Sequence, residues 1–369
     1  MIIYGAFIIP ILCSIFLLYF YKKRVVWWEF VIIFTVCIPV IFTAKYLSEK
    51  AQVTDVEYWG SLAKIAIHDE PWNEYIHQTC TRPVSCGKDC TTIQTYDCSY
   101  VQYHPRYCRF NTSINETVNL SYDEYKKVVK KWGGKEIFTD MHRNYHTIDG
   151  NRFHVSWDNN YDTAIPIVVE HSWENRVQAA SDVFNFPEVS EEDKTKYALY
   201  DYPKEIGYSL PTIMGIKDPE AQKRFMYLNA LYGPMKRIRL WVLIYYDKTL
   251  DAGEYQEMLW KKGNKNEFVI CISVDRNKNI QWAHVFTWAE QSKLTIETRD
   301  FIMQQKQLNL LELANFVERN VIPPFKKKNF REFNYLQVEP SGTAVAISYI
   351  IVLLVNIIVG AWVVLNDVE

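Results

Sequence analysis

The residues with the clearest chemical potential are five cysteines that fall within one stretch of 29 residues. They are Cys80, Cys86, Cys90, Cys98 and Cys108; His104 lies among them, and His77 comes three residues before Cys80. Cysteines in a loop-rich extracytoplasmic segment commonly form disulfides. Two thiolates spaced as Cys86-x3-Cys90 around a glycine could instead chelate zinc, with other cysteines or histidines completing four ligands. We favour disulfides, and because five is odd we expect Cys108 to stay free.

Three aspartates suggest a different chemistry. Asp247, Asp251 and Asp275 lie at or just after the ends of predicted strands. Open α/β sheets commonly bind ligands at strand ends, and carboxylate oxygens suit a divalent cation such as calcium or zinc. The alternative is that these aspartates are turn residues, a position that aspartate often occupies. The sequence specifies no other cofactor.

A second possible metal-ligand group contains His142 and His146, with Asp140 nearby and His154 beyond. Asparagine, threonine and glycine around the two histidines argue against the helix that would align both imidazoles. We therefore favour polar loop residues. The chain contains no G-x-S-x-G, H-E-x-x-H or P-loop sequence, so no catalytic motif stands out.

The chain that must position these residues begins with two apolar segments and ends with a third. Residues 2–20, 25–44 and 344–365 are each close to the ~20 residues that a helix needs to cross a bilayer. Charges follow the first segment instead of preceding it, which argues against a cleaved signal peptide. The predicted fold class is an α+β membrane protein. Its parts are a transmembrane helical hairpin (1–46), a β-rich region containing the cysteines and histidines (47–210), an α/β domain (211–337) and a transmembrane helix (344–365).

The short turn between the first two apolar segments indicates the orientation. Lys22, Lys23 and Arg24 lie in this turn, and positively charged short loops stay in the cytoplasm. The turn at 21–24 and the C-terminus are therefore predicted to be cytoplasmic. The large domain is predicted to lie on the periplasmic or extracellular side, where disulfides persist.

The predicted α/β domain alternates helices and strands. We predict helices at 219–232 and 251–261, strands at 238–246, 268–274 and 280–286, and a last helix capped by Asn309. This order favours an α/β sandwich with one mixed sheet. Before the domain, Ser121 is expected to cap a helix that ends at Trp132.

Several motifs of this domain resemble a known family. They are the strand end Ile244-Tyr-Tyr-Asp247, the helix end Trp260-Lys-Lys-Gly263, Asn264-Lys-Asn-Glu-Phe-Val-Ile270, Ser273-Val-Asp275 and Val321-Ile-Pro-Pro-Phe325. Residues 238–330 thereby resemble a TPM domain, a small extracytoplasmic fold of membrane-anchored proteins. Where that family has a glycine-rich turn, this chain has Val285-Phe-Thr-Trp288. The chain as a whole resembles a family of uncharacterised membrane-anchored proteins of bacteria and tailed phages.

These observations lead to two functional hypotheses. The first is a membrane-anchored extracytoplasmic interaction or assembly module, with the lipid bilayer and other membrane proteins as partners. The second, implied by the resemblance, is a metal-dependent hydrolase of the phosphatase type in which Asp247 and Asp275 hold the metal. The formal net charge of -2 argues against a nucleic-acid binder, which usually carries a strong basic excess.

Overall fold

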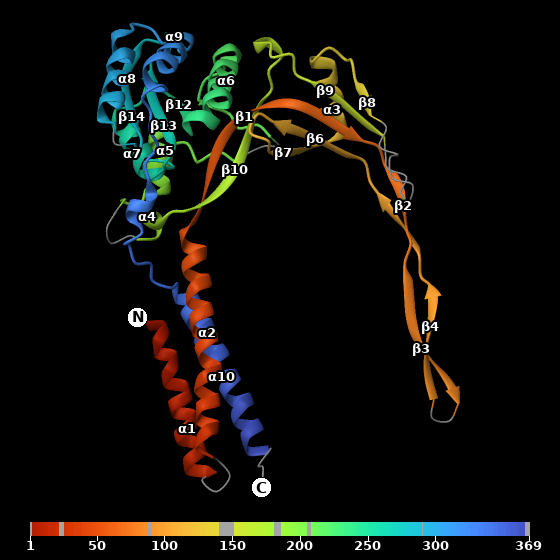
Figure 1. Cartoon of the computed structure of the whole chain (residues 1–369). Helices are drawn as coiled ribbons and strands as arrows, with labels where there is room; N and C mark the ends of the chain where they lie inside the picture. The colour runs from red at the N-terminus through yellow and green to blue at the C-terminus, as the bar shows by residue number, and fades with distance from the viewer. Residues whose placement is uncertain are drawn as a thin grey trace. The chain divides into compact units, whose positions relative to one another are not determined.

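The computed structural model describes residues 2–21, 26–87, 90–139, 151–180, 186–204, 208–289 and 291–365. The chain divides into two compact units. The anchor unit comprises Met1–Glu57, Ser172–Glu188 and Asn329–Glu369, and the sheet unit comprises Tyr58–His171 and Val189–Lys328. Figure 1 traces the chain through the elements of both units. This division differs from the predicted segments because stretches that are distant in the sequence belong to one unit.

The anchor unit contains the three apolar helices. The 3-10 turn η1 (Ile2–Phe7) leads into α1 (Ile8–Phe20), and the other two helices are α2 (Trp27–Val53) and α10 (Gly342–Leu365). All three segments are long and apolar enough to cross a membrane, as predicted. The described part of the unit also contains the short elements α4 (Arg176–Ala179) and η4 (Phe330–Phe333). The charged turn Lys22–Arg24 lies outside the described residues.

A polar contact joins two of these helices. Asn356 of α10 is 2% exposed and donates a hydrogen bond to Sγ of Cys37 in α2 at 3.0 Å. The same amide donates to the carbonyl oxygen of Val352 at 2.7 Å. Hydrogen bonds between helices stabilise packing inside a bilayer, where the hydrophobic effect does not drive association. Cys37 therefore belongs to helix packing, together with the buried Ile41 and Val352.

The first sheet of the sheet unit has six strands in the order β7-β6-β1-β9-β8, with β10 also paired to β1. The strands are β1 (Thr54–Asp69), β6 (Tyr107–Thr112), β7 (Thr117–Leu120), β8 (Ile137–Thr139), β9 (Arg152–Ser156) and β10 (Pro166–Glu174), and the short helix η2 (Tyr161–Thr163) precedes β10. Helix α3 (Tyr122–Lys131) buries Tyr125 and Val128 against this sheet. It begins where predicted, because Ser121 and Glu124 exchange hydrogen bonds in a capping box.

The second sheet has the order β11-β12-β13-β14. Its strands are β11 (Ile213–Met214), β12 (Arg239–Tyr246), β13 (Glu267–Val274) and β14 (Ile280–Phe286). The first three run parallel and β14 runs antiparallel, so the predicted mixed sheet is confirmed. The surrounding helices are α5 (Glu191–Tyr197), α6 (Pro219–Lys236), α7 (Asp251–Leu259), α8 (Ser292–Gln304) and α9 (Leu310–Phe316), which continues into the π-helix η3 (Val317–Val321).

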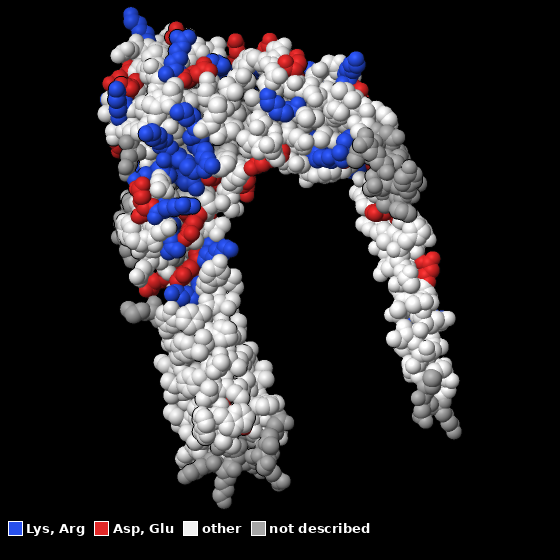
Figure 2. All heavy atoms as spheres, viewed as in Figure 1, with Lys and Arg blue, Asp and Glu red and all other residues white. Residues whose placement is uncertain are grey.

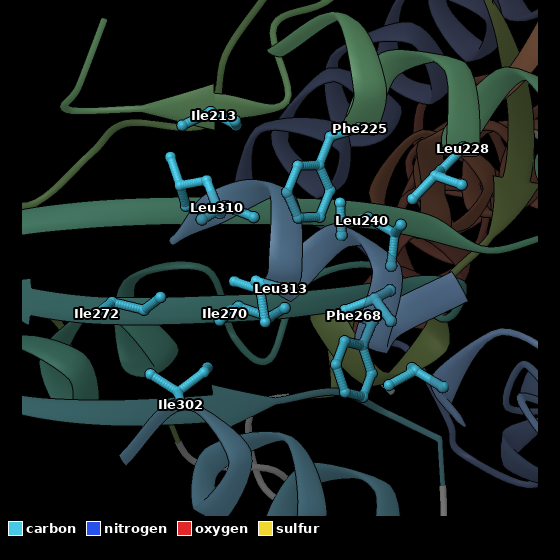
Figure 3. Packing of buried hydrophobic residues seen from close by; sticks show 14 of the residues in the cluster. Ile213, Phe225, Leu228, Leu240, Phe268, Ile270, Ile272, Ile302, Leu310 and Leu313 are labelled. Atoms are coloured by element: carbon cyan, nitrogen blue, oxygen red, sulfur yellow. The ribbon is translucent and has the colours of Figure 1, made fainter. Parts of the chain in front are cut away.

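Side chains alternate between the two faces of this sheet, as strand geometry requires. Figure 3 shows one face, where Phe225 of α6, Ile302 of α8 and Leu313 of α9 lie over strand residues such as Ile270. On the opposite face, the Tyr245 hydroxyl donates to Oε1 of Gln256 in α7 at 2.8 Å. Helices therefore cover both faces of the sheet.

Two elements of this domain were absent from the predicted order. Helix α8 follows β14, and β11 adds a short parallel strand beside β12. Helix α8 buries only Leu294, Thr298 and Ile302, so its apolar stripe is thin and one of its three members is polar. The remaining predicted helices and strands of this domain are present.

Candidate functional site

The cysteine stretch forms two antiparallel ribbons. Strand β2 (Trp72–Ile76) pairs with β5 (Tyr100–His104), and β3 (Thr79–Gly87) pairs with β4 (Cys90–Asp97). A disulfide joins Cys80 of β3 to Cys98, which lies just after β4, with 5.8 Å between their Cα atoms. The disulfide closes the base of the β3–β4 ribbon, so it limits separation of the two strands where the ribbon has no core beneath it.

The other cysteines of the stretch have separate positions. Cys86 also takes part in a disulfide, whereas the side chain of Cys90 lies outside the described residues. Cys108 is a free thiol in β6, buried in the core of the six-stranded sheet. It is the free cysteine that we expected. The disulfide interpretation is thus confirmed for Cys80 and Cys98.

The histidines of the stretch have local partners. Nε2 of His104 lies 2.7 Å from Oε2 of Glu74, and the His104 ring stacks on Trp72 with 4.3 Å between ring centroids. His77 packs edge-on against Tyr75. Across the described part of the chain, no three His, Cys, Asp or Glu side chains form a group that could hold a metal ion. The zinc alternative therefore gains no support here, because two of its candidate sulfurs are bonded to each other.

The β3–β4 ribbon is exposed along its length. Every residue of β4 from Thr91 to Asp97 is exposed, and Ile93 has 74% of its surface accessible. The neighbouring β2–β5 ribbon exposes Val101 and Tyr103 by 59% and 63%. Figure 2 shows few charged side chains on the visible face of these strands. Exposed strands that carry few charges and that no layer covers are a feature typical of binding elements.

The three candidate metal-binding aspartates follow strand ends but do not converge on a cation site. Asp247 and Asp275 come directly after the adjacent parallel strands β12 and β13, and Asp247 N donates to the carbonyl oxygen of Val274 at 3.1 Å. The side chain of Asp247 accepts a hydrogen bond from Gln281 at 3.1 Å. Asp251 opens α7 and accepts a hydrogen bond from the Thr249 hydroxyl.

The Asp275 carboxylate is occupied by its own turn. It accepts hydrogen bonds from the backbone N–H groups of Asn277 and Asn279 and from the Asn279 amide, all between 2.7 and 2.8 Å. The bonds from Asn279 are the main reason why the pKa of Asp275 lies below its ordinary value. The alternative that these aspartates are turn residues therefore accounts for the contacts of Asp275. The metal site remains a prediction, because the described residues form no group of metal ligands.

The second possible metal-ligand group, around His142 and His146, is described by the structure only at His154. Asp140, His142 and His146 lie outside the described residues. His154 is in β9, paired in register with Ile67 of β1 and Ile137 of β8. It is thus a strand residue of the six-stranded sheet.

The sequence did not predict a buried polar cluster around Glu267. Glu267 is wholly buried at the start of β13 and accepts hydrogen bonds from the Tyr202 hydroxyl, Nε1 of Trp241 and the backbone N–H of Asn264. Burial raises the pKa of Glu267 despite these bonds. The signal in the sequence is a single acidic residue directly before the apolar run 268–272. Because all its described partners come from the sheet unit's own core, the cluster has the character of a structural network.

The arrangement offers no assembled catalytic group among the described residues, and its most distinctive feature is the exposed, disulfide-closed ribbon. The chain matches no protein-family model, no curated protein and no solved structure.

Proposed function

We propose that the protein is a membrane-anchored extracytoplasmic assembly module that pairs with a second copy of itself through the outer edge of β4. The exposed β3–β4 ribbon carries the proposal. The disulfide between Cys80 and Cys98 supports the extracytoplasmic placement, since disulfides are rare in the cytoplasm. The predicted cytoplasmic turn at Lys22–Arg24 favours the same side.

The register of the ribbon identifies which backbone groups are free to pair. Cys98 N donates to the carbonyl oxygen of Gln78 at 2.9 Å. Hydrogen-bonded pairs alternate along an antiparallel ladder, so Arg82 pairs through hydrogen bonds with Gln94, and Pro83 does not do so with Ile93. The backbone N–H and C=O groups of Ile93 and its alternate neighbours in β4 therefore point away from β3.

The two edges of the ribbon differ in their ability to accept a new strand. Pro83 lies at an outward-facing position of β3 and has no N–H to donate. Between Thr91 and Tyr96, β4 contains neither proline nor a charged residue. Natural edge strands commonly carry proline or lysine, which block pairing with another chain. The edge of β4 lacks both, so strand addition is expected there.

The sequence of β4 also suits pairing with itself. An antiparallel pair centred on Ile93 places the two Ile93 side chains opposite each other and Thr91 opposite Thr95 of the second copy. No charge would face a like charge in this pair, and such cross-strand pairs of apolar or threonine side chains stabilise sheets. A two-fold pair of this kind uses the same surface on both copies, as most homodimers do.

Cross-linking tests the proposed register. In the purified full-length chain in detergent, Ile93→Cys is expected to give a disulfide-linked dimer under mild oxidation, because directly opposed residues lie within disulfide range. Thr81→Cys, at an outward-facing position of β3, is the control and should stay monomeric on a non-reducing gel.

Proline substitution tests the edge independently. Thr81 and Thr95 form one cross-strand pair of the ribbon, and each points its N–H outward. Thr95→Pro should weaken the dimer at least about tenfold by light scattering, whereas Thr81→Pro should leave it intact. A monomeric wild-type chain, or equal effects of the two prolines, would contradict self-pairing through β4. If the chain is monomeric but binds a different extended polypeptide at this edge, the proposal that a second copy binds there is wrong.

A metal-dependent phosphatase is a second proposal, supported by the resemblance to TPM domains and by the adjacent positions of Asp247 and Asp275 after parallel strands. It predicts hydrolysis of a generic phosphomonoester in the presence of calcium or zinc. The activity should disappear in Asp247→Asn while the thermal unfolding midpoint stays unchanged, because asparagine tolerates the left-handed backbone of this position (φ 51°). Absence of hydrolysis, or hydrolysis that persists in this variant, would exclude the assigned site.

A further inference from the structure

The anchor unit contains a pocket of about 540 Å³ beside the part of α2 that extends past the apolar segment. Its walls come from three segments that the fold brings together: the end of α2 with Thr54, the end of β10, and α4. The lining residues with polar or aromatic side chains are Tyr46, Glu49, Lys50, Thr54, Ser172, Trp173, Glu174 and Arg176.

The depth of this pocket relative to a bilayer follows from the helix itself. The apolar segment of α2 ends at Ala44, and Lys45 is the first charged residue after it. A helix rises about 1.5 Å per residue, so Lys50 lies roughly 9 Å beyond Ala44 along the axis. The headgroup region extends about 5–8 Å beyond the hydrocarbon on each side. Tyr46, at one end of the pocket, therefore lies within the headgroup region, and Lys50 lies at its outer boundary.

The surface of the anchor unit agrees with this placement. In Figure 2 the three apolar helices are almost entirely white, and blue and red spheres appear only toward one end of them. Tyr46 and Trp173 at the pocket are the aromatic types that are enriched where a membrane meets water. A headgroup bound here would have its acyl chains directed along the apolar helices.

The charges around the pocket leave one cation without a carboxylate. Glu49 lies 3.5 Å from Nζ of Lys45, and Glu174 lies 2.7 Å from Nε of Arg176. Nζ of Lys50 lies 5.8 Å from the centre of the Tyr46 ring. Among the residues that the structure describes, no carboxylate is within ion-pair distance of Lys50. An anion is the ligand that would balance this lysine.

Hydrogen-bond donors surround the same space. Arg176 uses Nε for Glu174 and one terminal nitrogen for the carbonyl oxygen of Leu336 at 3.1 Å. A guanidinium has five N–H groups in all, so further donors remain. The Ser172 hydroxyl, on an exposed residue of the pocket wall, adds another. Phosphate oxygens accept such bonds from arginine, lysine and hydroxyl groups together.

We propose that this pocket binds the phosphate group of an anionic phospholipid, with Lys50 as its counter-ion and Arg176 and Ser172 as donors. The site would fix the rotation of the anchor unit in the membrane, since a headgroup held on one side of α2 defines which face meets the lipid. This inference does not depend on pairing through β4.

Native mass spectrometry of the full-length chain in detergent tests the proposal. Micelles are supplemented with phosphatidylglycerol or with phosphatidylcholine, and bound lipid is counted. The wild type should retain one phosphatidylglycerol in preference to phosphatidylcholine. One lysine near an anionic lipid contributes enough to change retention about fivefold, so Lys50→Gln should lose about that much and Lys50→Arg should keep it. Lys130→Gln, an equal change of charge at an exposed position of α3, is the matched control.

Two further arms separate the possible sources of the phosphate group. Added inorganic phosphate or glycerol 3-phosphate should displace little of the bound lipid, because neither has acyl chains. Displacement at equal concentration would assign the pocket to a soluble anion and overturn the lipid proposal. Equal retention of both lipids, or an unchanged Lys50→Gln variant, would also overturn it.

Discussion

Replacing Glu267 by leucine is expected to lower the stability of the sheet unit by about 3–5 kcal/mol, the range for removing one member of a buried charged or hydrogen-bonded group. Glu267 is 0% exposed, and three donors converge on its carboxylate. Leucine fills much of the same volume but accepts no hydrogen bond. The Trp241 N–H, at 2.9 Å in the native protein, would then have no acceptor in the core.

The measurement is thermal unfolding of the purified full-length chain in detergent. For a domain of this size, a loss of 1 kcal/mol lowers the midpoint by about 2–4 °C, so the expected fall is roughly 6–20 °C. Glu254→Leu is the control, because Glu254 is an exposed residue of α7 in the same unit. Exposed substitutions of this kind change stability by no more than about 0.5 kcal/mol. Similar unfolding midpoints for the two variants would show that the cluster around Glu267 does not contribute to the stability of the sheet unit.

The same carboxyl predicts a pH dependence. Burial raises the pKa of Glu267 above its ordinary value of 4.5. A group whose pKa is raised by folding stabilises the native state below its unfolded pKa, and this contribution is lost as the pH rises through the folded pKa. The advantage of the wild type over Glu267→Gln, which does not titrate, should therefore be largest near pH 4 and decrease toward neutral pH. If the stability advantage of the wild type instead grew with pH, the pKa of Glu267 would be lowered by folding and not raised.

The sequence predicted the elements whose signal is local. The three apolar helices follow from hydropathy, and α3 follows from Ser121 and Glu124, which form its capping box. Residues 240–246 of β12 and 268–272 of β13 form continuous apolar segments, as expected for parallel strands covered on both faces. Helix α8 could not be predicted in this way, because Thr298 interrupts its buried stripe.

The candidate sites depended on contacts that no local pattern specifies. The presence of a disulfide was predicted from the number of cysteines and the predicted compartment, but the pairing of Cys80 with Cys98 depends on the register of β3 and β4. Asp247 and Asp275 come directly after strands, as predicted, whereas Asp251 is the first residue of α7. Asp275, however, directs its oxygens to Asn277 and Asn279, and such competition between a turn and a ligand site is invisible in residue types alone. The pocket at Lys50 required three segments that are distant in the sequence.

The second large effect is expected at Gly60, where the backbone of β1 lies directly against α6. A Cβ atom on Gly60 would lie 2.2 Å from the carbonyl oxygen of Asn229 and 2.7 Å from the nitrogen of Ala230. Gly233 of α6 faces it, and a Cβ there would lie 2.9 Å from Gly60 N. Two glycines thus allow a strand and a helix to approach at backbone distance. Alanine at position 60 would force them apart.

Helix α6 cannot move without cost, because it is bonded to the second sheet. Asn229 is 1% exposed, donates to the carbonyl oxygen of Leu240 at 3.1 Å and accepts from its N–H at 2.7 Å. Separation of β1 from α6 would strain these bonds or open the small apolar cluster of Leu62, Trp157, Ala164 and Ala230. We expect Gly60→Ala to cost about 3 kcal/mol, the upper part of the range for overpacking.

Thermal unfolding in detergent should show this cost as a fall of about 6–12 °C in the midpoint of the full-length chain. Gly342→Ala is the matched control, since a Cβ at the start of α10 would meet nothing within 4 Å. An unchanged midpoint for Gly60→Ala would mean that β1 and α6 do not approach as closely as the structure places them. If Gly60→Ala instead lowers the midpoint while Gly342→Ala does not, the close glycine contact is one of the contacts that join the two sheets of this unit, beside the hydrogen bond from Asn266 to the carbonyl oxygen of Tyr58.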